Sequence, residues 1–264
     1  MLTIDKYLRP ATLEEAYQAA QQKNSVVLGG MLWLRLGKKR VSTAIDLSDL
    51  GLDYITETDA CWKIGAYTSL RALETHEGLN RMTNNGFRNA FGAIAGVQFR
   101  NLATAGGSIF GRYGFSDVLT LCLALDASVE LHHAGVLSLE TFCDQGIRGD
   151  ILKEIRIPKS PVRVSYQAQR NTATDFPVLN VCAVLRDDRI HIAVGARPLR
   201  AVSLGFAVEP GADPEELASR LADTAAEETV FGSNTRASAQ YRKHLCRVLV
   251  RRAVREVLSG KEEI

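Results

Sequence analysis

Residues 99 to 117 read Phe-Arg-Asn-Leu-Ala-Thr-Ala-Gly-Gly-Ser-Ile-Phe-Gly-Arg-Tyr-Gly-Phe-Ser-Asp, and this stretch decides the fold. The glycine pair Gly106-Gly107 has no Cβ atoms, so the backbone there can approach a ligand closely. Thr104 and Ser108 flank the pair and add hydroxyl groups beside the backbone N–H groups. A loop of this kind that leads into an apolar helix is typical of an anion site, and pyrophosphate would suit it.

A second glycine pair, Gly29-Gly30, follows the apolar run Ser25 to Leu28. The run predicts a short buried strand, and the glycines predict a turn at its end. The two glycine turns lie far apart in the sequence. Together they could hold one extended cofactor between them.

Composition indicates a globular protein. The chain has 264 residues, of which 46% are hydrophobic, and a net charge of +2, which gives no reason to expect nucleic-acid binding. No apolar run approaches the roughly 20 residues needed to cross a bilayer, and the N-terminal residues lack a signal-peptide pattern. We therefore expect neither membrane insertion nor export.

The cysteines predict a reducing environment, the cytoplasm. Five cysteines are scattered without a Cys-x-x-Cys pair, so the sequence shows neither a disulfide framework nor a ligand set for an iron–sulfur cluster. His132-His133 lacks the helical spacing of a zinc site and is interpreted as surface, and no metal ligand is predicted.

Common catalytic motifs are also missing from the sequence. It contains no Gly-x-Gly-x-x-Gly, no P-loop and no Gly-x-Ser-x-Gly, and its paired carboxylates stand in polar surroundings. No catalytic residue is predicted, so the chemistry must come from a cofactor.

Helix and strand signals alternate along the first part of the chain, up to Pro158. Two prolines within four residues, Pro158 and Pro161, then resist both helix and central strand, which predicts a domain boundary. We expect domains at 1–158 and 162–264. In the second domain, strands are predicted at 164–170 and 189–194, and helices at 214–225 and 237–258. The last helix has a basic face, which either solvent or a partner subunit could cover.

The stretch from Arg100 to Ser108, with Asp117 and the run Leu123 to Ala127, resembles the second flavin motif of the FAD-binding medium subunits of molybdenum hydroxylases, such as xanthine and carbon monoxide dehydrogenases. The run Val26 to Gly30 stands where the first flavin motif of this family is expected. Two further segments, 166–177 and 236–242, resemble its C-terminal domain.

The resemblance implies a two-domain α+β fold. An FAD-binding domain of two α/β lobes, of the vanillyl-alcohol-oxidase type, would precede a small C-terminal domain like that of the carbon monoxide dehydrogenase flavoprotein. It implies a first flavin loop made of Val26, Val27, Leu28, Gly29, Gly30, Met31, Leu32 and Trp33. It implies a second loop made of Thr104, Ala105, Gly106, Gly107 and Ser108, with Asp117 and Leu152 also near the flavin.

The resemblance also implies noncovalent FAD in this chain, with molybdopterin and a 2Fe-2S cluster in partner subunits and NAD or another acceptor receiving the electrons. Two features depart from the family pattern: Met31-Leu32-Trp33 replaces small polar residues, and a lysine often found near Tyr166 is absent. A flavin-free scaffold subunit and a stand-alone flavin oxidase therefore remain as alternatives.

Overall fold

The computed structural model describes residues 1–259, which divide into two compact units that are each assembled from separate stretches of chain. Unit 1 contains Met1–Ala72, Gly96–Gly111 and Ala127–Pro158. Unit 2 contains Leu73–Ala95, Arg112–Asp126 and the described part of Lys159–Ile264. Both glycine loops fall in unit 1.

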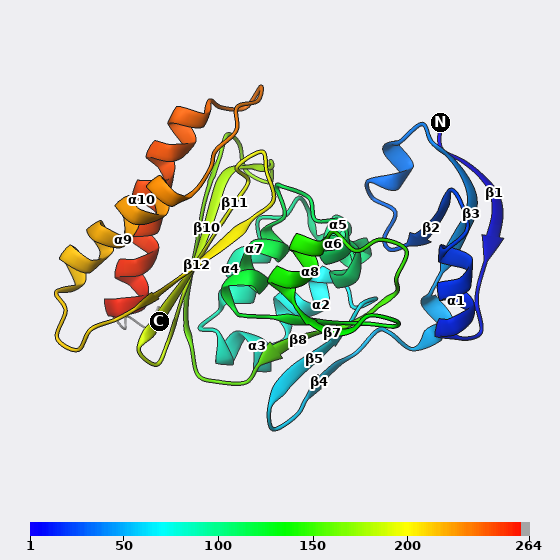
Figure 1. Ribbon diagram of the computed structural model, residues 1–264, viewed down its shortest axis with the longest axis horizontal. Coiled ribbons are helices and arrows are strands. Elements are labelled where there is room, and N and C mark those ends of the chain that lie inside the picture. The colour runs from blue at the N-terminus through cyan, green and yellow to red at the C-terminus, as the bar shows by residue number, and fades with distance from the viewer. Residues whose placement is uncertain (260–264) are drawn as a thin grey trace. The chain divides into compact units, whose positions relative to one another are not determined.

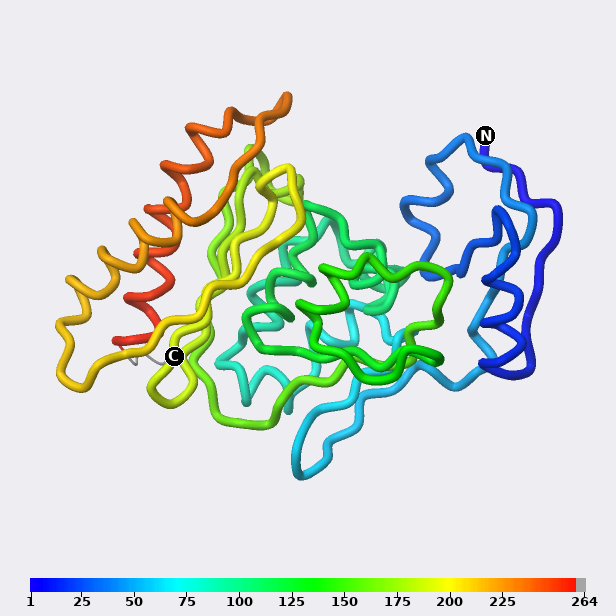
Figure 2. Tube along the Cα trace, in the orientation of Figure 1, coloured from blue at the N-terminus to red at the C-terminus, as the bar shows by residue number. Residues whose placement is uncertain are grey.

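The first lobe of unit 1 is a three-stranded parallel sheet in the order β1-β3-β2. Its strands are β1 (Thr3–Leu8), β2 (Ser25–Leu28) and β3 (Arg40–Asp46), with α1 (Leu13–Ala20) and the short 3₁₀ turns η1 (Leu34–Leu36) and η2 (Ser48–Leu50). The blue end of the trace shows β1 and β3 side by side (Figure 2). Thr12 caps α1 by accepting the N–H of Glu15.

The second lobe of unit 1 is a five-stranded antiparallel sheet in the order β4-β5-β8-β6-β7. Its strands are β4 (Ile55–Glu57), β5 (Cys61–Gly65), β6 (Ser128–Leu131), β7 (Gly135–Ser138) and β8 (Leu152–Pro158). Three helices, α5 (Val97–Leu102), α6 (Ala105–Phe110) and α8 (Leu139–Gln145), belong to this unit, and α6 packs against β5 and β8. The helix α2 (Leu70–Thr75) carries the chain from unit 1 into unit 2.

Unit 2 is built on a four-stranded antiparallel sheet in the order β12-β11-β10-β9. Its strands are β9 (Arg163–Arg170), β10 (Pro177–Arg186), β11 (Arg189–Gly195) and β12 (Val202–Ala207). Its helices are α3 (Glu77–Met82), α4 (Gly86–Phe91), α7 (Asp117–Ala124), α9 (Pro214–Glu228) and α10 (Ala239–Ser259). The helices α9 and α10 cover one face of the sheet, and α7 covers the other (Figure 1).

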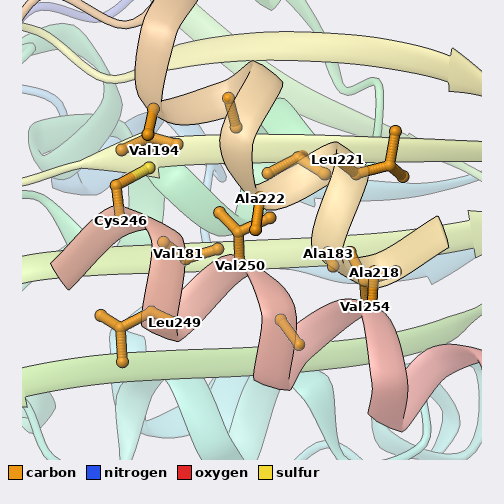
Figure 3. Close-up of a cluster of buried hydrophobic side chains, with 14 of the residues drawn as sticks. Val181, Ala183, Val194, Ala218, Leu221, Ala222, Cys246, Leu249, Val250 and Val254 are labelled. Atoms are coloured by element: carbon orange, nitrogen blue, oxygen red, sulfur yellow. The ribbon is translucent and has the colours of Figure 1, made fainter. Parts of the chain in front are cut away.

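The core of unit 2 lies between the sheet and α9 and α10. Alternate residues of β10, such as Val181 and Ala183, point toward Leu221 and Val250, and all four are buried (Figure 3). The pattern follows from the two-residue repeat of a strand and the apolar stripe of each helix. This core explains why β10 is almost wholly apolar and buried.

Several basic residues on the polar face of α10 form ion pairs with α9. Lys243 and Arg247 pair with Glu227 of α9, and Arg255 pairs with Glu215 of the same helix. A substantial part of the basic charge is therefore neutralised within the chain.

One arginine of α10 is buried instead. Arg242 is 1% exposed, and its guanidinium donates to the carbonyl oxygens of Val178 (2.9 Å), Gly232 (2.9 Å) and Ala237 (2.6 Å) and to Oδ1 of Asn234 (2.7 Å). These bonds tie the loop before α10 to the start of β10.

Most of the elements predicted from the sequence are present, and β2 has the predicted bounds. The strands β10 and β12 were not predicted. Among residues 1–259, no helix combines the length and the apolar character needed to cross a membrane.

Candidate flavin-binding site

The first glycine loop begins where β2 ends. Leu28 is 6% exposed and closes the strand, and Gly29 and Gly30 carry the chain out of the sheet. Met31 then takes a left-handed backbone conformation with φ of 57°, which is unusual for a residue other than glycine. The backbone conformation of the loop therefore depends on Met31 as well as on the two glycines.

This loop leaves backbone donors open. Among the described residues, none accepts a hydrogen bond from the N–H of Gly30, Met31 or Leu32. A left-handed residue within a turn directs successive N–H groups toward one point, an arrangement that binds anions. Three consecutive free N–H groups are a donor set that fits a phosphate group.

The apolar side chains of this loop pack within the first lobe. Met31 packs against Leu28, Val41 and Ala44, and Leu32 is 8% exposed. Of the preceding residues in β2, Val26 packs against the same cluster, while Val27 is 36% exposed. The residues that depart from the family pattern therefore stabilise the loop through packing, and the backbone supplies the polar groups.

The second glycine loop differs from the sequence expectation. Its N–H groups, which the sequence offers as anion donors, are bonded within unit 1: Ala105 donates to Thr68 O and Gly106 to Ala66 O, each at 2.8 Å. Gly107 donates to Thr104 Oγ1 at 3.1 Å, and the Ser108 hydroxyl donates to Thr104 O at 2.9 Å. The reason is that Thr104 caps α6 and the preceding turn is pinned to the chain after β5.

The structure brings the two loops together. A Cβ on Gly29 would lie 2.7 Å from Thr104 Oγ1 and 3.6 Å from the Cα of Gly107. A Cβ on Gly106 would lie 2.7 Å from Ala66 Cβ. Because neither position leaves room for a side chain, glycine at 29 lets the two loops meet, and glycine at 106 lets the second loop pack on Ala66.

Leu152, predicted near the flavin, is the first residue of β8 and is 5% exposed. It pairs with Leu131 of β6 and belongs to unit 1, as the two glycine loops do.

Asp117 lies in unit 2, at the start of α7, and is 5% exposed. Its Oδ1 accepts hydrogen bonds from the hydroxyl of Tyr166, from Arg170 Nη2 (2.8 Å) and from Asn180 Nδ2 (3.0 Å). Burial, with the adjacent Asp117 charge, raises the pKa of Tyr166 well above its ordinary value. Asp117 is thus the acceptor of a buried polar network that joins α7 to β9 and β10.

Sequence reasoning missed Ala66, Tyr67 and Thr68, which contact the glycine loops. No motif marks them, and two of them act through backbone carbonyl oxygens, which every residue possesses.

Two known families match successive parts of the chain. Residues 2–160 match the model of the FAD binding domain in molybdopterin dehydrogenase, and residues 164–257 match that of the CO dehydrogenase flavoprotein C-terminal domain.

Individual relatives align over almost the whole chain. The chain is 26% identical over 262 residues to the uncharacterized protein YgfM of Escherichia coli (strain K12), covering 94% of each chain. It is 25% identical over 278 residues to the nicotine 6-hydroxylase medium subunit of Paenarthrobacter nicotinovorans, covering 95% of this chain and 96% of that one.

Among solved structures, CO dehydrogenase from Oligotropha carboxidovorans has the same fold, with a TM-score of 0.83 and 21% identity over 98% of this chain and 99% of that chain. The two-domain FAD-binding fold and the family predicted from the sequence are thereby confirmed. The chain belongs to the family of FAD-binding domains in molybdopterin dehydrogenases, and it carries the C-terminal domain of the CO dehydrogenase flavoproteins.

Proposed function

We propose that the chain is the FAD-carrying electron-transfer subunit of a molybdenum hydroxylase complex. It would receive electrons from an iron–sulfur subunit and deliver them to NAD or another acceptor. Residues 1–158 would hold the cofactor, and 162–264 would form the C-terminal domain.

One observation supports the cofactor most strongly: the free N–H groups of Gly30, Met31 and Leu32 in a loop that touches the second glycine loop. These groups would bind the pyrophosphate of FAD. Arg35, Lys38 and Lys39, which follow the loop and are exposed, would add a positive field that attracts the phosphates.

When bound, FAD would supply the redox chemistry, and the work of this chain would be to hold and orient it. We propose that the first loop, from Val26 to Trp33, and the second, from Thr104 to Ser108, line the site. Leu152 would contribute an apolar contact. Asp117 would act through the buried network that fixes α7.

The names of two relatives support the proposal that this chain has partner subunits. One relative is a medium subunit of nicotine 6-hydroxylase and another is a medium chain of glyceraldehyde dehydrogenase, so each is one chain of a larger enzyme. We propose a molybdopterin-binding subunit and a 2Fe-2S subunit as partners of this chain. The five free cysteines, Cys61, Cys122, Cys143, Cys182 and Cys246, support a reducing location, the cytoplasm.

The test uses the full chain with and without its partners. Titration with FAD should give a saturable complex with one flavin per chain, and dithionite should bleach it anaerobically while purines and aromatic heterocycles do not. Affinity purification from the native host should recover two further polypeptides, one with molybdopterin and one with iron–sulfur absorbance.

Two results would contradict the proposal. A folded protein that co-purifies with the same partners but binds no FAD would establish a scaffold subunit. Turnover of an organic substrate by the isolated chain would establish a flavin oxidase.

A further inference from the structure

The segment Ala66 to Thr68, directly after β5, contacts both glycine loops. Its backbone holds the second loop: Ala66 O accepts the N–H of Gly106, and Thr68 O accepts the N–H of Ala105, both at 2.8 Å. Ala66 and Thr68 are buried, with exposed fractions of 5% and 1%. The middle residue, Tyr67, points its side chain toward the other loop.

The Tyr67 hydroxyl reaches the end of β2. It lies 2.8 Å from the carbonyl oxygen of Leu28, the last residue before Gly29-Gly30. It also lies 2.9 Å from Asp46 Oδ1 and accepts the N–H of Leu47 at 3.3 Å. The single proton of this hydroxyl is shared between Leu28 O and Asp46 Oδ1, so one group joins the ends of β2 and β3 at the start of the first glycine loop.

The surroundings keep this hydroxyl protonated. Burial, followed by the hydrogen bond to Asp46, raises the pKa of Tyr67 above its ordinary value. Burial opposes ionisation of Asp46, but hydrogen bonds from Tyr7, Ser48 and Tyr67 outweigh it and lower the pKa of that carboxyl. At neutral pH, Tyr67 is thus a donor beside an ionised acceptor, and its aromatic ring packs against the core of the lobe.

We propose that Tyr67 is a positioning residue of the flavin site, whose hydroxyl fixes the open N–H groups of the first loop against the second loop. The inference rests on the proposed binding of FAD. It follows because the chain around Tyr67 bonds to both loops: its backbone accepts the N–H groups of Ala105 and Gly106, and its side chain bonds to Leu28 O.

Loss of the hydroxyl should act on binding rather than on folding. The ring of phenylalanine retains the packing, while Leu28 O, two residues before Gly30, loses the proton that it shares with Asp46. The first loop then samples more conformations, and binding must select the competent one. We expect the Kd for FAD to rise by about three- to tenfold, the effect of one ordinary hydrogen bond.

Tyr7 offers a matched control. Its hydroxyl also donates to Asp46, but Tyr7 lies on β1 and is 56% exposed. Tyr67→Phe and Tyr7→Phe each remove a hydroxyl that is bonded to the Asp46 carboxylate. Only Tyr67→Phe also removes a contact with Leu28. ADP is a second probe, because it carries the pyrophosphate without the flavin ring.

The experiment measures Kd for FAD and for ADP in the wild type and both variants, under conditions where circular dichroism shows all three folded. Tyr67→Phe should weaken both ligands by the same factor and shift the ³¹P resonances of bound FAD. Tyr7→Phe should change neither.

The outcomes separate the two proposals. A wild-type protein that binds neither FAD nor ADP would defeat the proposed function. Equal affinities and unchanged ³¹P resonances in Tyr67→Phe, with wild-type binding intact, would overturn the role of Tyr67 alone. Equal losses in both tyrosine variants would also overturn it, since they would trace the effect to Asp46.

Discussion

A Cβ atom on Gly30 would lie 1.9 Å from the carbonyl oxygen of Leu102 and 2.6 Å from its carbonyl carbon. The first glycine loop therefore rests directly on the backbone at the end of α5. Neither backbone can move aside without disturbing the turn that leads into α6. The contact explains why this position needs glycine for reasons of space, although its φ is not in the left-handed region.

Gly30→Ala should destabilise unit 1. We expect the free energy of unfolding to fall by about 3 kcal/mol, because the clash is with backbone and overpacking at rigid sites has costs of this order. Chemical denaturation measures it. Gly96→Ala is the control, since a Cβ there would meet only the flexible end of Gln98 at 3.3 Å. Similar stability of the two variants would show that the loop and α5 do not touch as described.

Gly107→Asp should abolish FAD binding while the protein stays folded. Gly107 is exposed and faces Gly29, and a Cβ there would approach only Thr104 Oγ1, at 2.9 Å. A carboxylate at this point would repel the pyrophosphate, and we expect a loss of affinity of about 100-fold or more. Gly107→Asn has nearly the same shape without the charge and should lose much less. Flavin content and circular dichroism are measured together, and wild-type occupancy in folded Gly107→Asp would place the phosphate elsewhere.

FAD should leave the protein on denaturation. The free cysteines Cys122, Cys182 and Cys246 are buried, and burial raises their pKa values and so disfavours the reactive thiolate form. Acid precipitation of the reconstituted protein should leave the yellow colour in the supernatant. Flavin that stays with the precipitated polypeptide would contradict noncovalent binding.

Stability should fall in acid through Glu154. Its burial opposes ionisation, but hydrogen bonds from Tyr54 and Arg156, with the Arg156 and Lys63 charges, lower its pKa. A lowered pKa in the folded state means that the stabilisation is present above the ordinary glutamate pKa and is lost as the pH falls through the folded-state value. The free energy of unfolding should therefore decrease below about pH 4 to 5.

Glu154→Gln tests this assignment. It should lower the free energy of unfolding at pH 7 by about 2 kcal/mol, because Glu154 is buried and accepts charged hydrogen bonds. Its acid profile should be flatter than that of the wild type. Glu227→Gln is the control, since Glu227 is 60% exposed in its pairs with Lys243 and Arg247. A wild-type acid slope in Glu154→Gln would show that another carboxylate is responsible.

The sequence predicted the family and the fold class because the stretch from Arg100 to Ser108 resembles a flavin motif of that family, and it raised the possibility that two distant glycine turns hold one cofactor. It offered backbone donors in both glycine loops, and in the structure those of Ala105 and Gly106 in the second loop are already bonded. The N–H groups of Ala105 and Gly106 are used by Thr68 and Ala66, almost forty residues earlier, and no local pattern reveals such long-range bonds.

The packing role of the Met31 side chain was not predicted from the sequence. As a residue type it suggests a lost side-chain donor, but the side chain packs against the apolar cluster of this lobe, and the backbone N–H stays free. The strand β10 escaped prediction because it is buried on both faces and so lacks the alternation that marks a half-exposed strand.

The hydrogen bonds of Arg242 hold the loop before α10 against β10, and their strength depends on neither acid nor salt. No carboxylate of residues 1–259 pairs with it, and its acceptors are the neutral oxygens of Val178, Gly232, Asn234 and Ala237. The ion pairs between α9 and α10 weaken when glutamates are protonated or when salt screens them. The loop that Arg242 holds has no such dependence, so it should stay closed on β10 under conditions that loosen the outer face of the two helices.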